Sequence, residues 1–188
     1  HLTFSYYSKF NQPINNLPST LTHLTFGQHY NQPINNLPST LTHLTFGKHF
    51  DQPINNLPST LTHLTFDYYS QFNQSVDNLS FLKSSITHLT FGKKFNQSID
   101  NLPSTITHLS LCRYFNQSVN NLPSTITHLN FYFYSQFNQS VDNLPSSIIH
   151  LTFADKFNQP VDNLPPLITH LTFGSYFNQT VDNLPSSI

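Results

Sequence analysis

The sequence of 188 residues contains no Glu, Met or Trp, one Ala, one Arg and only four Gly. Ala, Glu, Met and Arg are among the strongest helix formers, so their near absence, together with 13 Pro and many Asn, argues against a helical protein. No apolar run reaches the roughly 18 residues of a membrane-spanning helix. The chain begins at His1 without a signal peptide, so we expect it to be a piece of a longer protein.

Charge and cysteine are equally scarce. Only 8% of the residues are charged and the formal net charge is −1. The sequence therefore has no cluster of basic residues that would bind nucleic acid or an acidic membrane surface. Cys112 is the only cysteine, which excludes an internal disulfide framework and favours a reducing compartment. We therefore expect neither a nucleic-acid partner nor a membrane partner.

The sequence consists of an internal repeat that fills residues 1–188. Nine units of 19 to 25 residues follow one another, and we number them as coils one to nine. They begin at His1, His23, His43, His63, His88, His108, His128, His150 and His170. Each unit has six large apolar positions, represented in coil two by Leu24, Phe26, Tyr30, Ile34, Leu37 and Leu41. The sequence therefore predicts a single domain built from nine similar coils.

The spacing of the apolar residues predicts the shape of one coil. Thr-His-Leu-Thr-Phe alternates polar and apolar residues with a period of two, which favours a short strand with Leu and Phe inward. The apolar residues that follow are separated by Asn, Pro and Ser, which favours turns and extended return segments. Stacked coils pair their strands and bury a common core. We predict an all-β repeat solenoid: a leucine-rich-repeat-like right-handed coil with one parallel sheet and helix-poor return segments. Three additional residues near 80–83 are expected to bulge outward.

The phrase F-N-Q-[PS]-[IV]-x-N-L-P recurs with few changes, and residues 37–56 show it in its setting, L-P-S-T-L-T-H-L-T-F-G-K-H-F-D-Q-P-I-N-N. This pattern resembles FNIP repeats, a divergent leucine-rich-repeat class of amoebae and giant viruses, over essentially the whole chain. The resemblance implies a module that binds protein partners and often follows an F-box. No such module lies within these residues.

Equivalent residues of stacked coils lie about 4.8 Å apart, so each recurring Asn predicts a ladder. The first ladder is the Asn of F-N-Q, from Asn11 to Asn178, with Asp51 as a substitute. We expect its amides to be buried and to satisfy backbone groups of the turn and of the next coil. The same expectation applies to a second ladder without exceptions: Asn16, Asn36, Asn56, Asn78, Asn101, Asn121, Asn143, Asn163 and Asn183.

Several of these asparagines match the N-glycosylation pattern. The six matches are Asn73, Asn78, Asn96, Asn116, Asn138 and Asn178. If the amides are buried, sugars would unfold the coils, so we interpret the matches as by-products of the repeat. This reasoning predicts an intracellular, cytoplasmic protein.

The nine unit-opening histidines are expected to form one column on the outer face of the sheet. They favour stacking and hydrogen bonding along the column, and a contact surface that includes His43, His63 and His88 is the alternative. A metal site lacks the remaining ligands, so no metal or other cofactor is predicted. Repulsion between neighbouring imidazoles should lower their pKa values, and stability should then fall below about pH 6.5.

Coils one, four and seven are longer between strand and bend and carry aromatic residues there. These are Tyr6, Tyr7, Tyr68, Tyr69, Tyr132 and Tyr134, together with Phe133. The recurrence at every third coil places them on one edge, where exposed Tyr is a favoured interface anchor. The alternative is that a three-unit block was duplicated and the tyrosines only cover their own loops.

The pair of residues before the second aromatic of each coil varies in charge and size. The candidate contacts there are Lys48, Lys93, Lys94 and Arg113. Variation on a constant scaffold is typical of a recognition surface, and drift at an exposed position is the alternative.

The sequence does not support enzyme chemistry. Five of the eight Asp occupy a turn position that is Asn in other coils, and no glycine-rich phosphate loop is present. We predict a non-catalytic protein-interaction platform, which by resemblance could recognise substrates for an F-box ubiquitin ligase. The alternative is a spacer module without a defined ligand. Since both ends cut the array at unit boundaries, end-to-end contact between copies is also expected.

Overall fold

A computed structural model describes residues 1–80, 85–132 and 134–188. Nine short strands form one parallel sheet in chain order, and the one helix within these residues is the 3-10 helix η1, Asp77–Ser80. The predicted all-β solenoid with helix-poor return segments is confirmed. The strands are β1 Leu2–Thr3, β2 His23–Thr25, β3 His43–Phe46, β4 His63–Phe66, β5 His88–Thr90, β6 His108–Leu111, β7 His128–Phe131, β8 His150–Thr152 and β9 His170–Thr172.

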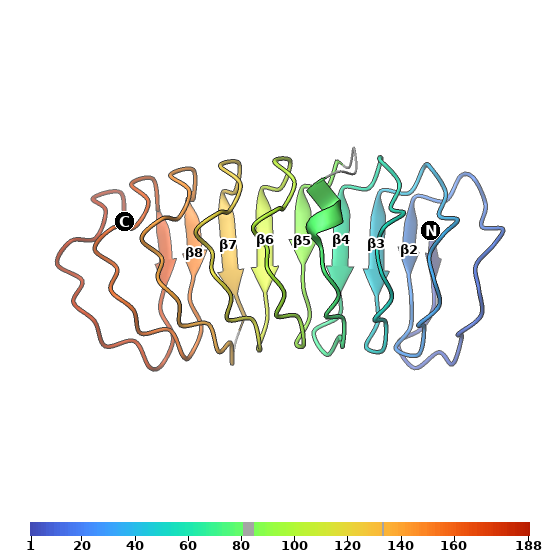
Figure 1. Cartoon of the computed structure of the whole chain (residues 1–188), viewed down its shortest axis with the longest axis horizontal. Coiled ribbons are helices and arrows are strands. Elements are labelled where there is room, and N and C mark those ends of the chain that lie inside the picture. Colours follow the sequence, from blue (N-terminus) through green and yellow to red (C-terminus); the bar gives the residue numbers. More distant parts are fainter. Residues whose placement is uncertain (81–84, 133) are drawn as a thin grey trace.

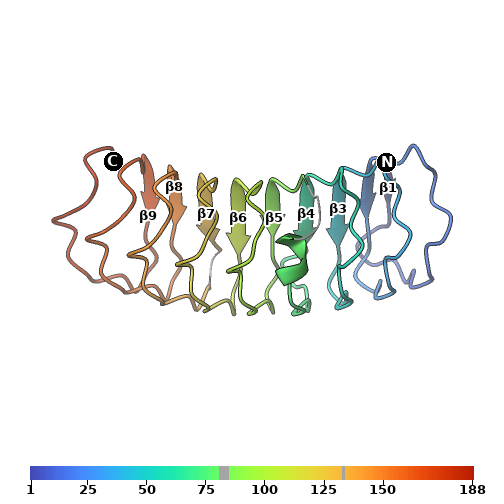
Figure 2. The same cartoon turned by 45° about the horizontal axis from the view of Figure 1, so that its top comes forward.

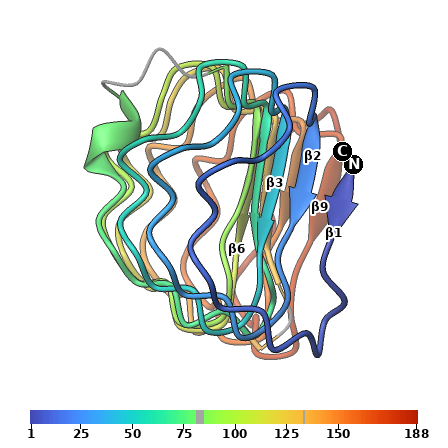
Figure 3. The same cartoon turned by 90° about the vertical axis from the view of Figure 1, so that its right-hand side faces the viewer.

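The coils stack side by side into an elongated, curved array (Figure 1). Figure 2 shows the return segments and η1 lying in front of the sheet as a second layer. Viewed along the array, β1 and β9 lie farther out than β6 on the sheet side (Figure 3). The sheet therefore lines the concave face, and the return segments form the convex back.

Register in the sheet follows the repeat residue by residue. His43 pairs with His63, Leu44 with Leu64 and Thr45 with Thr65, and the other strand pairs keep the same register. Because equivalent residues are always neighbours, each type of side chain forms a column along the array. The alternation predicted for the strands is present, since in β3 Leu44 and Phe46 are buried and His43 and Thr45 are half-buried.

The core consists of aliphatic columns and two aromatic columns. Within a coil, the strand Phe stacks on the aromatic residue of the bend, with ring centroids 3.7 Å apart for Phe46 and Phe50. Each ring also stacks on its copy in the next coil, as for Phe95 and Phe115 at 6.3 Å. Offset stacking of this kind adds to the hydrophobic free energy of burial.

Exceptions to the predicted core lie at the C-terminal end and at one substitution. Val181 and Ile188 are exposed in coil nine, the last coil of the described residues. In coil two the bend residue is Tyr30, which is fully buried, and its hydroxyl has no hydrogen-bond partner in the described part of the chain. Burial raises the pKa of Tyr30 to about 12.

Two glycines that follow the strand Phe, Gly47 and Gly92, lie against the backbone of the preceding coil. A Cβ added at Gly47 would lie 2.4 Å from the carbonyl oxygen of Gly27, and one at Gly92 would lie 2.3 Å from that of Asp67. Neither glycine has a positive φ angle. Glycine is therefore needed here for space and not for backbone conformation. The bulge expected at residues 80–83 falls mostly on residues 81–84, which lie outside the described residues.

Candidate functional site

The second Asn ladder lies on the convex back, in a turn that we call the back turn (residues 15–16, 35–36 and their equivalents). Its first residue, Asn or Asp, accepts a hydrogen bond from the second residue, Asn, of the next coil, as in Asn101 Nδ2 to Asp77 Oδ1 at 3.0 Å. Six such donors are Asn56, Asn78, Asn101, Asn121, Asn163 and Asn183. Only an acceptor oxygen is required at the first position, which explains why Asp and Asn interchange there.

The predicted burial of this ladder is wrong. Asn78 is half-buried, and the other eight asparagines are exposed on the back. The sequence pattern shows that the residue is constant. It does not show whether the constancy comes from burial or from a bond between coils at the surface.

The first Asn ladder forms a continuous chain of hydrogen bonds at the bend. Each side-chain oxygen accepts the backbone N–H of the equivalent residue in the next coil, for example Asn96 Oδ1 from Asn116 N at 2.9 Å. Asp51 continues the chain, because its carboxylate accepts from Asn73 N at 2.9 Å. The predicted bonding to a backbone group of the next coil is present, but these side chains too are exposed or half-buried.

This exposure removes the argument drawn from the glycosylation pattern. Asn73, Asn116, Asn138 and Asn178 are exposed, and in each of the first three the bond to the next coil uses Oδ1. Since the amides are not buried, a sugar on Nδ2 would not require the coils to open. The pattern therefore gives no indication of the protein's location.

The unit-opening histidines form the predicted column on the concave face. Neighbouring rings stack along the whole array, with centroids 3.8 Å apart for His1 and His23 and 4.3 Å apart for His128 and His150. In most coils Nδ1 lies near the hydroxyl of the preceding Thr, as in Thr42 Oγ1 to His43 Nδ1 at 2.8 Å. The candidate contacts His43, His63 and His88 are thus held in fixed orientation at half-buried positions.

Four histidines of the column have lowered pKa values. The pKa values of His23, His63 and His128 are lowered, and that of His108 is lowered to about 4. The largest cause is loss of solvation by the charged ring, and repulsion from neighbouring imidazoles adds to it. The predicted direction is therefore found, but repulsion is the smaller of the two causes.

The turn after each strand forms a continuous edge that we call the turn ridge: residues 6–7, 28–29, 48–49, 68–69, 93–94, 113–114, 132 and 134, 155–156 and 175–176. It runs along the lower edge of the array in Figure 1. Every tyrosine except Tyr30 lies on it. Tyr7 is 77% exposed and Tyr134 65%, whereas Tyr68 is half-buried. The exposed tyrosines of the described residues thus all lie on the ridge.

The long bends of coils one, four and seven are built on a conserved local turn. Ser70 N donates to Asp67 O at 2.8 Å, and the buried Ser70 hydroxyl accepts from Phe72 N at 3.2 Å. This places Tyr68 and Tyr69 at the tip, where their rings meet edge to face at 5.0 Å. Burial is the largest cause that raises the pKa of Tyr6, and Asp67, three coils away, contributes to it.

The six cations among the described residues lie on or beside the same edge. Lys48, Lys93, Lys94, Arg113 and Lys156 are ridge residues, and Lys9 directly follows the ridge turn of coil one. Near the middle, Lys93 Nζ, Lys94 Nζ and Arg113 Cζ lie 5.9, 4.9 and 5.5 Å from the centre of the Tyr114 ring. In the sequence, the tyrosines of the long bends and the variable pairs of the short bends are separate features. In the structure, both lie on the turn ridge.

Comparison with known proteins identifies the repeat. The FNIP Repeat family model matches residues 10–49, 30–69, 72–113, 95–134, 115–156 and 157–188. The chain belongs to the FNIP repeat family. The array is also similar to the crystal structure of CroV588, a giant-virus protein described as a novel circular LRR protein, with 42% sequence identity and a TM-score of 0.76. The match covers 100% of this chain and 32% of CroV588. The search of curated proteins finds no match.

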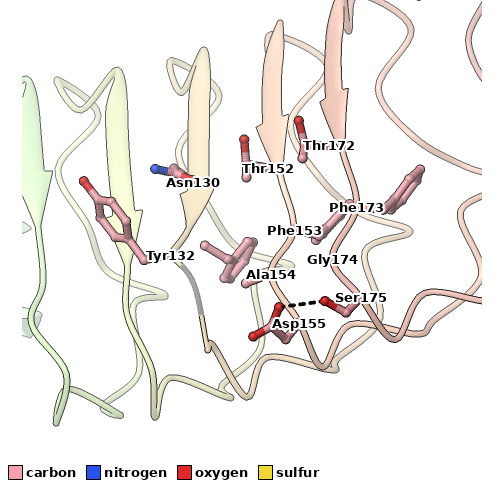
Figure 4. Close-up of a pocket in the computed structure, with 11 residues that line it drawn as sticks. Asn130, Tyr132, Thr152, Phe153, Ala154, Asp155, Thr172, Phe173, Gly174 and Ser175 are labelled. Atoms are coloured by element: carbon pink, nitrogen blue, oxygen red, sulfur yellow. Dashed lines mark hydrogen bonds between the residues drawn. The ribbon is translucent and has the colours of Figure 1, made fainter.

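The FNIP array has a depression where the sheet meets the ridge. Its volume is about 440 Å³, and it opens at the ends of β7, β8 and β9 (Figure 4). Asp155 accepts a hydrogen bond from Ser175 Oγ at 3.3 Å beside it. The lining residues are Asn130, Phe131, Tyr132, Thr152, Phe153, Ala154, Asp155, Thr172, Phe173, Gly174 and Ser175. The ridge is therefore bordered by a partly apolar recess in this region.

Tyr114, Tyr176 and Lys156 belong to the variable pairs of the sequence but not to the predicted contacts. The structure places them on the ridge, where Lys156 Nζ lies 3.8 Å from the centre of the Tyr176 ring. Cys112 is buried, and burial raises its pKa to about 12, so it is an unreactive core thiol.

The described residues contain neither a metal-binding cluster nor a membrane-spanning helix. Among them, no three His, Cys, Asp or Glu side chains are arranged to hold a metal ion. None of their helices has the length and apolar character needed to cross a membrane.

Proposed function

We propose that the FNIP array is a non-catalytic protein-binding scaffold and that the turn ridge is its binding surface. The observation that supports this most directly is the gathering of eight of the nine tyrosines on one edge. Exposed Tyr gives a large contact area at a low entropy cost, and exposed apolar patches of this kind mark interaction sites. The depression beside Tyr132 would accept an apolar side chain of such a partner.

The rest of the array supports this division of roles. The ladders of the bend and the back turn, the histidine column and the aromatic columns each join one coil to the next. The ridge side chains form few such bonds, so their variation leaves the scaffold intact. In a longer protein with an F-box, the array would recognise substrates of a ubiquitin ligase. A cytoplasmic location fits this role and the unpaired Cys112.

The test compares two triple variants in affinity capture from cells of the native host. The first variant replaces the exposed tyrosines Tyr7, Tyr69 and Tyr134 with Ser. The control carries Asp100→Asn, Asp142→Asn and Asp162→Asn in the back turn, where Asn occurs naturally in other coils. We expect a stoichiometric partner that the control retains and the Tyr variant loses, with both melting temperatures within about 2 °C of the parent chain.

This experiment also distinguishes the binding scaffold from the alternative, a spacer module without a defined ligand. If the Tyr variant captures the same proteins in the same amounts as the control, the ridge is not a binding surface and the spacer function stands.

A further inference from the structure

The charges of the array are segregated between two of its edges. The six described cations lie on or beside the turn ridge, whereas five of the eight carboxylates lie in the back turn. These carboxylates are Asp77, Asp100, Asp142, Asp162 and Asp182. A partner with negative charge would be repelled from the convex back and attracted to the ridge.

The cations are concentrated in coils five and six. Lys93, Lys94 and Arg113 surround the ring of Tyr114, with all three charges within 5.9 Å of its centre. Among the described residues, no carboxylate forms an ion pair with these three side chains. Three like charges over one ring repel one another, and a bound anion would relieve that repulsion.

Two carboxylates on or beside the ridge, Asp67 and Asp155, already form hydrogen bonds within the fold. Asp67 Oδ1 accepts the backbone N–H of Tyr69 at 2.9 Å, which holds the tip of the long bend in coil four. Asp155 accepts from Tyr134 N at 3.2 Å and from Ser175 Oγ at 3.3 Å. The cation cluster is thus left for a ligand from outside the array.

The aromatic neighbours indicate the class of that ligand. Tyr69 is 55% exposed and meets Tyr68 edge to face at 5.0 Å, next to the cations of coil five. A single-stranded nucleic acid needs free, parallel ring faces for its bases, but the Tyr114 ring is approached by cations and the Tyr68 and Tyr69 rings are nearly perpendicular. A protein segment needs a mixed surface of Tyr and Arg, which is what this part of the ridge offers.

We propose that the ridge from coil four to coil six binds an extended acidic segment of a partner protein. Carboxylates of the segment contact Lys93, Lys94 and Arg113, and an apolar side chain packs against Tyr69. This inference rests on the proposed function and adds the chemistry of the partner to it.

The direct test is fluorescence anisotropy with three labelled probes: a 12-residue peptide rich in Glu with two Phe, the same peptide with Gln in place of Glu, and a 12-nucleotide single-stranded DNA. The variant carries Lys93→Gln, Lys94→Gln and Arg113→Gln. The control carries Lys9→Gln, Lys48→Gln and Lys156→Gln, so both proteins lose the same charge from the same ridge.

We expect the dissociation constants of the acidic peptide for the parent chain and the control to agree within about twofold. The Lys93, Lys94 and Arg113 variant should bind it about tenfold more weakly, because three exposed charge pairs with the peptide are lost. Binding should weaken when NaCl is raised from about 50 to about 300 mM. Equal loss in both variants, equal binding of the Gln peptide, tighter binding of the DNA, or no saturable binding of the acidic peptide would each overturn the inference.

The two proposals fail in different ways. If the Tyr variant loses its cellular partner but the Lys93, Lys94 and Arg113 variant keeps it, the ridge binds a protein and only the acidic segment is wrong. If the Tyr variant keeps its partner, the proposed function itself is wrong.

Discussion

The back turn and the turn ridge share one period and are both exposed, yet they differ in what their side chains contact. In the back turn, Asn and Asp side chains bond to the next coil, and the sequence varies only between these two residues. In the ridge, coils are joined by the backbone, as in Gln28 N to Tyr6 O at 2.8 Å, and the side chains vary from Tyr to Lys to Ser.

This comparison shows how a solenoid separates scaffold from surface. A residue is constant where its side chain joins neighbouring coils, whether or not it is buried. It varies where the backbone makes most of the connections, and such positions are available for recognition. Four measurements test this distinction.

The largest expected effect on stability is at the base of the ridge, where the backbone contact between coils leaves no space for a Cβ at Gly47. Gly47→Ala would bring a Cβ to 2.4 Å from the carbonyl oxygen of Gly27. We expect a loss of about 2–3 kcal/mol in the free energy of unfolding, measured by urea denaturation, because adjacent coils must separate. Lys48→Ala, one residue later, should change it by less than about 0.5 kcal/mol. Similar stability of the two variants would show that the ridge is not constrained at its base.

The next effect concerns the aromatic column between the two turns. Tyr30→Phe removes a buried hydroxyl that has no partner among the described residues, so we expect stabilisation by about 1–2 kcal/mol and a higher melting temperature. The matched control is Phe50→Tyr, which adds a hydroxyl to the same column in the next coil and should destabilise the protein. Unchanged melting temperatures in both variants would mean that the hydroxyl finds a partner at this depth.

A smaller effect is expected in the bend ladder. Asn116→Ala leaves Asn138 N without its acceptor, and we expect a loss of about 1 kcal/mol, since water can replace part of the bond at this exposed site. Asn116→Asp keeps an acceptor oxygen, as Asp51 does naturally, and should retain the parent stability. A loss of the same size in both variants would contradict the acceptor role.

The smallest effect is that of pH on the histidine column. The folded pKa values of His23, His63, His108 and His128 lie below that of an unfolded His, near 6.5, so the unfolded chain binds more protons as the pH falls. Stability from this source is complete above about pH 6.5 and decreases below it. We expect a lower melting temperature at pH 5.5 than at pH 7.5, with a smaller difference in a His108→Gln, His128→Gln variant. An equal difference in both proteins would exclude the column as its source.

Much of the fold could be predicted from the sequence, because each repeat unit contains the pattern of its strand and of its return segment. The period-two alternation around Leu44 and Phe46 predicts the strand, and the near absence of helix formers predicts the extended return segments. Constant Asn residues predict ladders. Their burial could not be predicted, because a bond between surface side chains and a bond in the core leave the same pattern in one sequence.

The candidate surface was only partly accessible from sequence. The tyrosines of the long bends and the variable pairs of the short bends differ in their distance from the strand, so they look like separate features. In the structure, Tyr68 and Tyr69 lie beside Lys93 and Lys94 of the next coil, because Lys93 N donates to Tyr68 O at 2.8 Å and Lys94 N to Ser70 O at 3.2 Å. Only the folded bend could show that these residues share one edge.

The shape of one coil follows from the sequence: the scarcity of helix formers excludes helices, and the repeat places six apolar side chains inward in each unit. Which columns face solvent, and that aromatic and basic residues share one ridge, follows only from the tertiary structure. The physical reason is that local periodicity is a property of the chain, whereas exposure and the proximity of side chains 20 or more residues apart are set by how coils pack on one another.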